Sequence, residues 1–188
     1  MFMRELRDGE PFASGMVATG FWLGITLGRV VLGFVTGRIG EKMAVTIYLG
    51  LSVVLQILFW QIDSFVSSAI FIAVLGFFLG PLFPAAIMVA TKLLPRRLHV
   101  SAIGFVAAFG SSGAAVFPFA VGAIAQGTGV WVLQPFALAL IAGIFIIWVI
   151  LPGGIKKGGL DIAHEKMLEK EREKATLSAT GQRTEEIV

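Results

Sequence analysis

The chain has 188 residues, of which 56% are hydrophobic and only 14% charged, and its formal net charge is +3. Soluble domains are about 45–50% apolar and about 25% charged, so this composition excludes an ordinary soluble protein and predicts an integral membrane protein. The absence of cysteine excludes disulfides, thiol chemistry and cysteine-ligated metals. We expect no cofactor, no metal and no nucleic-acid partner, and we expect the lipid bilayer to be one partner.

The sequence divides into a polar outer segment (residues 1–14), a membrane domain (residues 15–152) and a charged cytoplasmic tail (residues 153–188). The membrane domain contains five apolar runs, each close to the ~20 residues that cross a bilayer as a helix. None alternates as a barrel strand would, so we expect an all-α membrane protein. The expected helices are residues 15–36, 44–62, 67–94, 101–126 and 132–151.

Positive charges gather on one side of the expected membrane. They follow the first, third and fifth helices and comprise Arg38, Lys42, Lys92, Arg96, Arg97, Lys156 and Lys157. The positive-inside rule therefore places the N-terminus outside and the C-terminus in the cytoplasm. We expect interfacial aromatic residues on both sides: Trp60 and Trp131 outside, Tyr48 and Trp148 inside. The sequence does not distinguish the plasma membrane from an organelle membrane.

The first expected helix has glycines at a spacing of four, at Gly20, Gly24 and Gly28, and again at Gly33 and Gly37. Residues four apart lie on one face of a helix, and small residues there let another helix come close within a membrane. We therefore expect this helix to be packed closely against a neighbour.

Arg29 is the one charge well inside an expected span, and no Asp or Glu lies inside any of the five. An arginine at such a depth costs at least about 2.5 kcal/mol unless it faces a partner, a cavity or the interface. Two interpretations stay open: Arg29 pairs with a carboxylate or an anionic substrate group, or it extends to the inner headgroups.

Proline interrupts two of the expected spans. Pro81 and Pro84 lack an N–H, so the carbonyls of Phe77 and Gly80 lose their helical partners, and Pro118 does the same in the fourth helix. Freed carbonyls at membrane depth are tolerated where protein or a water-filled cavity satisfies them, and broken helices are typical of transport pathways. The alternative is a simple packing kink. Ser111 and Ser112 lie at a similar depth.

Residues 110–113 read GSSG, which fits the GxSG pattern of rhomboid-type intramembrane proteases. Such an enzyme needs a histidine on a neighbouring helix to accept the serine proton. His99 falls in a loop and His164 in the tail, so helix packing explains the small residues better. We expect that the chain is not an enzyme.

Residues 33–42, GFVTGRIGEK, resemble the G-x-x-x-D-R-x-G-R-K loop motif of the major facilitator superfamily. The match is at Gly33, Arg38, Gly40 and Lys42. The sequence departs from the motif at Gly37, where the motif has Asp, and at Glu41, where it has Arg; Glu41 is a candidate substitute for the missing acid. Such departures are commoner in the second copy of the motif, between the eighth and ninth helices.

The resemblance aligns the five helices with the eighth to twelfth of a twelve-helix transporter, and residues 80–84 resemble the tenth helix of fungal fucose-permease-like members. It implies solute transport by alternating access, with the first, third and fourth helices facing the cavity and the second and fifth, including Gln56 and Gln134, as outer support. The implied substrate-binding candidates are Trp22, Phe83, Ser111 and Ser112. The implied conformational gate motif comprises Arg29, Gly33, Gly37, Arg38, Gly40, Glu41 and Lys42.

Five helices are one short of a half, so the resemblance implies that the chain alone is an incomplete, inactive transporter that needs an N-terminal half or a homo-oligomer. The alternative is an oligomerising structural membrane protein without transport activity. The charged stretch at residues 161–174 is either a docking segment or, as charge runs usually are, a solvated end.

Overall fold

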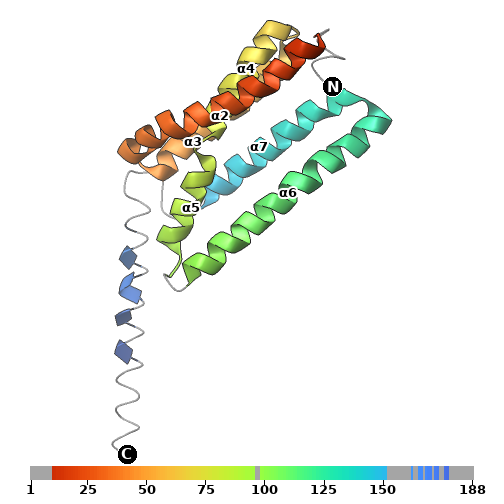
Figure 1. The fold of residues 1–188 in the computed structure, drawn as a ribbon. Helices are drawn as coiled ribbons and strands as arrows, with labels where there is room; N and C mark the ends of the chain where they lie inside the picture. The colour runs from red at the N-terminus through yellow and green to blue at the C-terminus, as the bar shows by residue number, and fades with distance from the viewer. Residues whose placement is uncertain are drawn as a thin grey trace, which may run out of the picture.

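The structure is a computed structural model that describes residues 10–95 and 98–151, together with residues 162, 165–166, 168–170, 172–173 and 176–177 of the tail. These tail residues are helical and exposed, and the rest of the expected docking segment and outer segment lies outside the described residues. Five helical spans are long and apolar enough to cross a membrane (Figure 1). The all-α prediction is therefore confirmed.

Each of the five spans runs antiparallel to the span before it, and short turns join them (Figure 1). All five spans begin two to four residues before the expected apolar runs and end within three residues of them. The first starts at Pro11, a residue whose missing N–H is not needed there. The elements are α2 (Pro11–Ile39), α3 (Glu41–Gln61), α4 (Phe65–Leu79), α5 (Leu82–Leu93), α6 (His99–Thr128), the 3₁₀ turn η2 (Val130–Val132) and α7 (Leu133–Ile150).

The third span is divided as the two prolines predict. α4 ends at Leu79, Gly80 and Pro81 form a turn, and α5 starts at Leu82 with Pro84 in its first turn. In Figure 1 the two halves differ in direction. The backbone is therefore irregular near the middle of this span.

The expected break at Pro118 is wrong. α6 continues through this residue from His99 to Thr128. One proline removes a single N–H and leaves the other helical hydrogen bonds of the neighbouring turns, so it can bend a helix without ending it. The divided span instead has two prolines three residues apart directly after a glycine.

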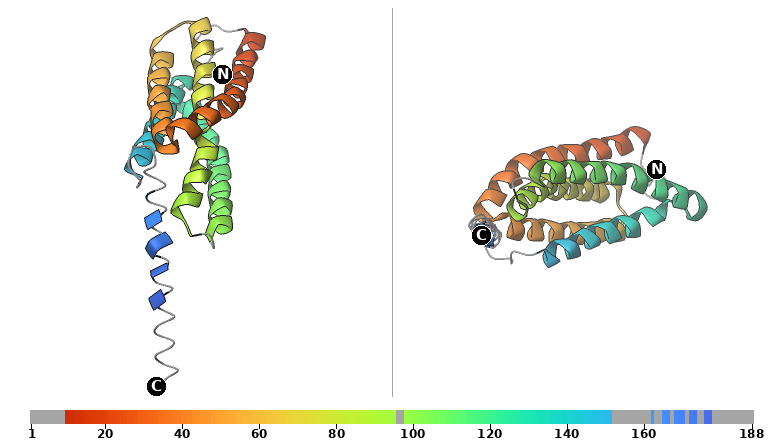
Figure 2. Two further views of the ribbon diagram at one scale, coloured as in Figure 1. Left: turned by 90° about the vertical axis from the view of Figure 1, so that its left-hand side faces the viewer. Right: turned by 90° about the horizontal axis from the view of Figure 1, so that it is seen from below.

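α2 crosses α4 at a contact built from four glycines, two on α2, one on α4 and one directly after its end (Figure 2). A methyl group on Gly24 would overlap the carbonyl oxygen of Ala73, and one on Gly28 would overlap that of Phe77. Reciprocally, methyl groups on Gly76 and Gly80 would meet the α2 backbone at Phe21 and Ile25. The two backbones are thus in direct contact, as the small-residue spacing predicts.

The second pair of glycines on α2 lies on a different face. Five residues separate Gly28 from Gly33, and a five-residue step turns about 140° around a helix. A methyl group on Gly33 or Gly37 would meet nothing within 4 Å. α2 therefore has one glycine face that packs and one that is open.

α3 lies between α4 and α7 and has more buried residues than any other helix of the described chain. Val45 and Leu49 pack against Ala85 and Val89 of α5 and Trp148 of α7. Tyr48 is buried too, with its hydroxyl 3.3 Å from the Thr36 hydroxyl of α2. Trp148 and Tyr48 are therefore core residues, and their predicted place in an inner aromatic belt is wrong.

The predicted outer belt residues have the exposure that an interface requires. Trp60 is 43% exposed and Trp131 is 57% exposed. These tryptophans come directly before or after turns at the same end of the bundle, where amphipathic rings are favoured in membrane proteins.

α6 stands apart from the helices that build this core. It runs antiparallel to α7, to which η2 joins it (Figure 1), and Val121 is its only buried residue in the described chain. Its large apolar side chains are exposed, among them Phe105, Phe109 and Phe119. This helix offers an apolar surface that only lipid or another polypeptide can cover.

Replacing Gly28 by leucine is expected to destabilise the fold, because the side chain would have to displace the backbone of Phe77. Overpacking a close-packed core typically costs about 1–3 kcal/mol, and a backbone obstacle favours the upper end. Gly33→Leu is the matched control on the open face. Thermal unfolding of the purified chain in detergent compares them, and equal melting temperatures would contradict the glycine crossing.

Candidate functional site

The ends of α3, α5 and α7 are bound together beside Gly40. Glu41, in the first turn of α3, forms a 2.9 Å ion pair with Lys92, in the last turn of α5. An acid at a helix start and a base at a helix end each oppose the local helix dipole, so both positions add to the pair. Glu41 therefore has an ionic partner although the motif's usual acid is absent.

Lys42 is the buried member of this network. Its ammonium donates to the carbonyl of Leu151, the residue that caps the end of α7, and its own carbonyl accepts from the indole N–H of Trp148 at 3.3 Å. Only 4% of the side chain is exposed. Lys42 thus joins α3 to α7 within the chain, a role that the motif alone did not indicate.

Gly40 makes the sharp turn between α2 and α3. Its φ is 103°, in the region that favours glycine, and its N–H closes α2 on the carbonyl of Thr36. The turn leaves Arg38 exposed beside the open glycines Gly33 and Gly37. Among the described residues Arg38 has no ion pair or hydrogen bond. The expected gate residues therefore differ: Glu41 and Lys42 are bound to other helices of the chain, whereas Arg38 is not.

Arg29 lies where α2 meets the break between α4 and α5. Its Nε donates to the carbonyl of Gly80 at 3.4 Å. This is the carbonyl that Pro84 deprives of a helical N–H. The sequence predicted both the freed carbonyl and the need for a partner for Arg29, but it did not predict that they satisfy each other.

The four candidate binding residues are all exposed, on three helices. Trp22 is on α2, Phe83 is on the first turn of α5, and Ser111 and Ser112 are on α6. The serine hydroxyls donate to carbonyls one turn back on their own helix, at 2.9 and 3.0 Å. No hydrogen bond or ring contact joins any two of these four side chains in the described part of the chain, so a common site for them stays a prediction.

The open face of α2 extends beyond its glycines. Trp22, Thr26, Arg29 and Gly33 follow at intervals of four, three and four residues, which places them along one side of a helix. All four are exposed. Two predicted groups, the binding residue Trp22 and the gate residues Arg29 and Gly33, are therefore on the same uncovered surface.

Gln56 and Gln134 form a buried pair between α3 and α7, with Gln56 Nε2 2.7 Å from Gln134 Oε1. Their exposures are 3% and 4%. A mutual amide bond satisfies two polar groups inside an apolar bundle, which fits the support role expected for these helices.

The serine-protease pattern does not become a catalytic site. His99 Nε2 lies 2.8 Å from the carbonyl of Leu94, so the ring is engaged at the start of α6. Ser112, the serine of the pattern, is thirteen residues further along the same helix, a rise of about 20 Å. A proton cannot pass directly between these groups.

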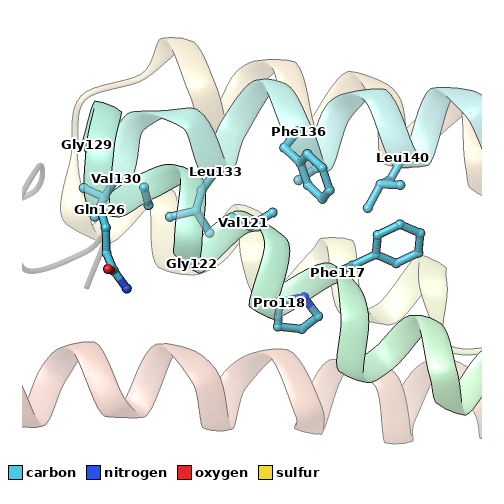
Figure 3. Close-up of a pocket in the computed structure, with 12 residues that line it drawn as sticks. Phe117, Pro118, Val121, Gly122, Gln126, Gly129, Val130, Leu133, Phe136 and Leu140 are labelled. Carbon is cyan, nitrogen blue, oxygen red and sulfur yellow. The ribbon is translucent and has the colours of Figure 1, made fainter.

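A groove of about 700 Å³ lies between α6 and α7, near η2 (Figure 3). Gln126 is the only polar side chain among the residues that line it, and Figure 3 shows its amide directed away from Phe136 and Leu140. None of the predicted binding residues lines this groove. Its apolar surface was not indicated by any motif.

Comparison of the sequence with models of known protein families identifies a match to one family. The family model described as "Major Facilitator Superfamily" matches residues 2–181. Among curated proteins the chain is 34% identical over 165 residues to "Bypass of stop codon protein 6" of Saccharomyces cerevisiae, covering 82% of this chain and 33% of that protein.

It is also 26% identical over 135 residues to "Glucose/mannose transporter GlcP" of Bacillus subtilis, covering 72% of this chain and 31% of that protein. The chain thus spans about a third of the length of both relatives. No solved structure matches it. The family match covers nearly all of a chain with five apolar helices and the loop motif at residues 33–42, so the chain is a multi-pass membrane protein that belongs to the major facilitator superfamily, a group of carriers and not of enzymes.

Proposed function

We propose that this chain takes part in the transmembrane transport of a small solute by alternating access, as the part of a transporter that corresponds to its eighth to twelfth helices. The observation that carries the proposal is the broken span packed against α2. Divided helices near the middle of the membrane frequently form the solute sites of carriers. Here the divided span packs against the glycines of α2.

The residues divide into rigid support and a free surface, as alternating access requires. The network of Glu41, Lys42, Lys92 and Trp148 holds α3, α5 and α7 as one body. The open face of α2 and the exposed α6 are the surfaces available to a second body. In this proposal Arg38, Gly33 and Gly37 contact that body in one state of the cycle, with the N-terminus outside.

The surface that remains uncovered supports the view that the chain needs further helices to transport. These come either from an N-terminal half or from another copy of the chain. The exposed pair Gly33 and Gly37 favours the second candidate function, an oligomerising membrane protein, because small residues four apart promote helix association.

The Glu41–Lys92 pair is expected to stabilise the assembled helix ends by about 1 kcal/mol, since it is partly buried and favourably placed on both helices. A double-mutant cycle of Glu41→Gln and Lys92→Met, followed by thermal unfolding, measures the coupling directly. Arg38→Gln, which removes an unpartnered charge nearby, is the control and should leave stability unchanged. A coupling energy of zero would argue against a stabilising ion pair between Glu41 and Lys92.

The purified chain reconstituted alone in liposomes is expected to give glucose flux no faster than empty vesicles, because the second body is missing. Saturable uptake that Pro84→Ala or Ser111→Ala abolishes would contradict this expectation. It would instead mean that a homo-oligomer forms the whole pathway.

A chimera tests the transport function itself. The segment of the Bacillus transporter that aligns with this chain is replaced by the chain, and glucose uptake is measured in cells lacking other carriers. We expect uptake above background, lost in the Gly28→Leu chimera and retained in the Gly143→Ala chimera, where an added methyl group on α7 would meet nothing within 4 Å. A wild-type chimera that inserts and folds yet never transports, while the chain alone dimerises, would favour the structural alternative.

A further inference from the structure

Arg29 carries a positive charge deep in α2 that the described chain does not neutralise. It lies ten residues before the end of the helix at Ile39, which is about 15 Å along the axis. Within the described residues no Asp or Glu forms an ion pair with it, and Glu41, at the start of α3, is bound to Lys92. A charge at this depth requires compensation from another source.

The hydrogen bond to Gly80 uses only one part of the guanidinium. Arginine has five N–H donors, and the bond to Gly80 engages the single one on Nε. The two terminal amino groups have no acceptor among the described residues, and the side chain is exposed. Because the Nε bond holds the group against the break, its fork of terminal donors is oriented and available.

The start of α5 adds backbone hydrogen-bond donors next to the same turn. α5 has twelve residues and begins directly after the turn at Gly80 and Pro81. In the described chain neither Leu82 nor Phe83 donates its N–H to a carbonyl of α4. Unpaired N–H groups at a helix start are donors that an anion can accept from, while the dipole of α5 is opposed by that of α4, which ends at the same turn.

The contact with Gly80 also distinguishes this arrangement from an arginine that extends along α2 to the headgroups. Gly80 is fixed against α2 by backbone contact with Ile25 and Arg29. The side chain therefore reaches across to the turn between α4 and α5 and is held within the span. Its planar fork matches the two oxygens of a carboxylate or phosphate.

We propose that Arg29 and the first turn of α5 form a binding site for the oxyanion of a small solute, a carboxylate or a phosphate group, with Phe83 at its edge. The proposal rests on the proposed transport function for its identification of the anion as cargo. Anion binding itself requires no transport, so an experiment can reject the anion site and the transport function independently of each other.

The test follows the Arg29 side chain in the wild-type protein, which avoids dependence on the folding of a variant. The full 188-residue chain, labelled with ¹⁵N-arginine, is placed in phosphatidylcholine nanodiscs and titrated with acetate, with inorganic phosphate and with glucose. The Nε–H resonance of Arg29 is assigned by its absence in Arg29→Lys. We expect a saturable shift with acetate or phosphate, no shift with glucose, and no shift of the Arg38 resonance.

Two variants sharpen the result. Arg29→Lys, which keeps the charge but loses the fork, is expected to weaken anion affinity about tenfold, measured by calorimetry. Arg38→Gln removes an equal charge from the same helix and should leave affinity unchanged. Non-saturable shifts of both arginines, or an affinity equally reduced by both variants, would overturn the proposal in favour of general charge screening.

Titrations in nanodiscs of different lipid composition distinguish a solute anion from a lipid headgroup phosphate. Nanodiscs containing phosphatidylglycerol are compared with phosphatidylcholine alone. A shift of Arg29 that anionic lipid produces, and that free acetate and phosphate do not, would overturn the assignment to a solute and assign the site to a headgroup phosphate. Binding of free anion together with a folded chimera that takes up neither glucose nor labelled acetate or phosphate would support the site and reject the transport function.

Discussion

Everything in this fold depends on the direct backbone contact between α2 and α4. Four glycines, Gly24 and Gly28 facing Gly76 and Gly80, remove the side chains that would otherwise hold the helices apart. In a membrane the hydrophobic effect does not drive helices together, so close packing has to do so. The same contact brings Arg29 within reach of the carbonyl that Pro84 leaves free, and thereby couples helix packing to the irregular backbone of the third span.

Near Gly40, some residues join helices of the chain to one another and others remain exposed. Glu41 and Lys42 fix α3 to α5 and α7, while Arg38, two residues before Gly40, remains exposed on α2. A conformational switch between two bodies needs rigid interiors and few, exposed contacts between them, because a ligand shifts such an equilibrium only through contacts that differ between states. The chain has both kinds of surface in adjacent residues.

Composition and spacing were sufficient to predict the helical class, the five spans, the close-packed glycines and the break at Pro81, because each is a local property of the sequence. The contacts between helices were not predictable, although Gly76 and Gly80, also four apart, could have indicated the partner of α2. Tyr48 and Trp148 were placed at an interface because aromatic residues favour it, but tertiary packing buried them. Pro118 was expected to break α6, but the helix tolerates the loss of one N–H.

The most direct test of this account measures the α2–α4 contact itself. The chain has no cysteine of its own, and a Cβ atom on Gly20 would lie 3.7 Å from that of Ala73, within the range of about 3.5–4.5 Å found across disulfides. Gly20→Cys with Ala73→Cys should form an intramolecular disulfide in membranes on mild oxidation, detected by mass spectrometry, and Gly33→Cys with Ala73→Cys should not. No disulfide in the first pair, or equal yields in both, would contradict the account.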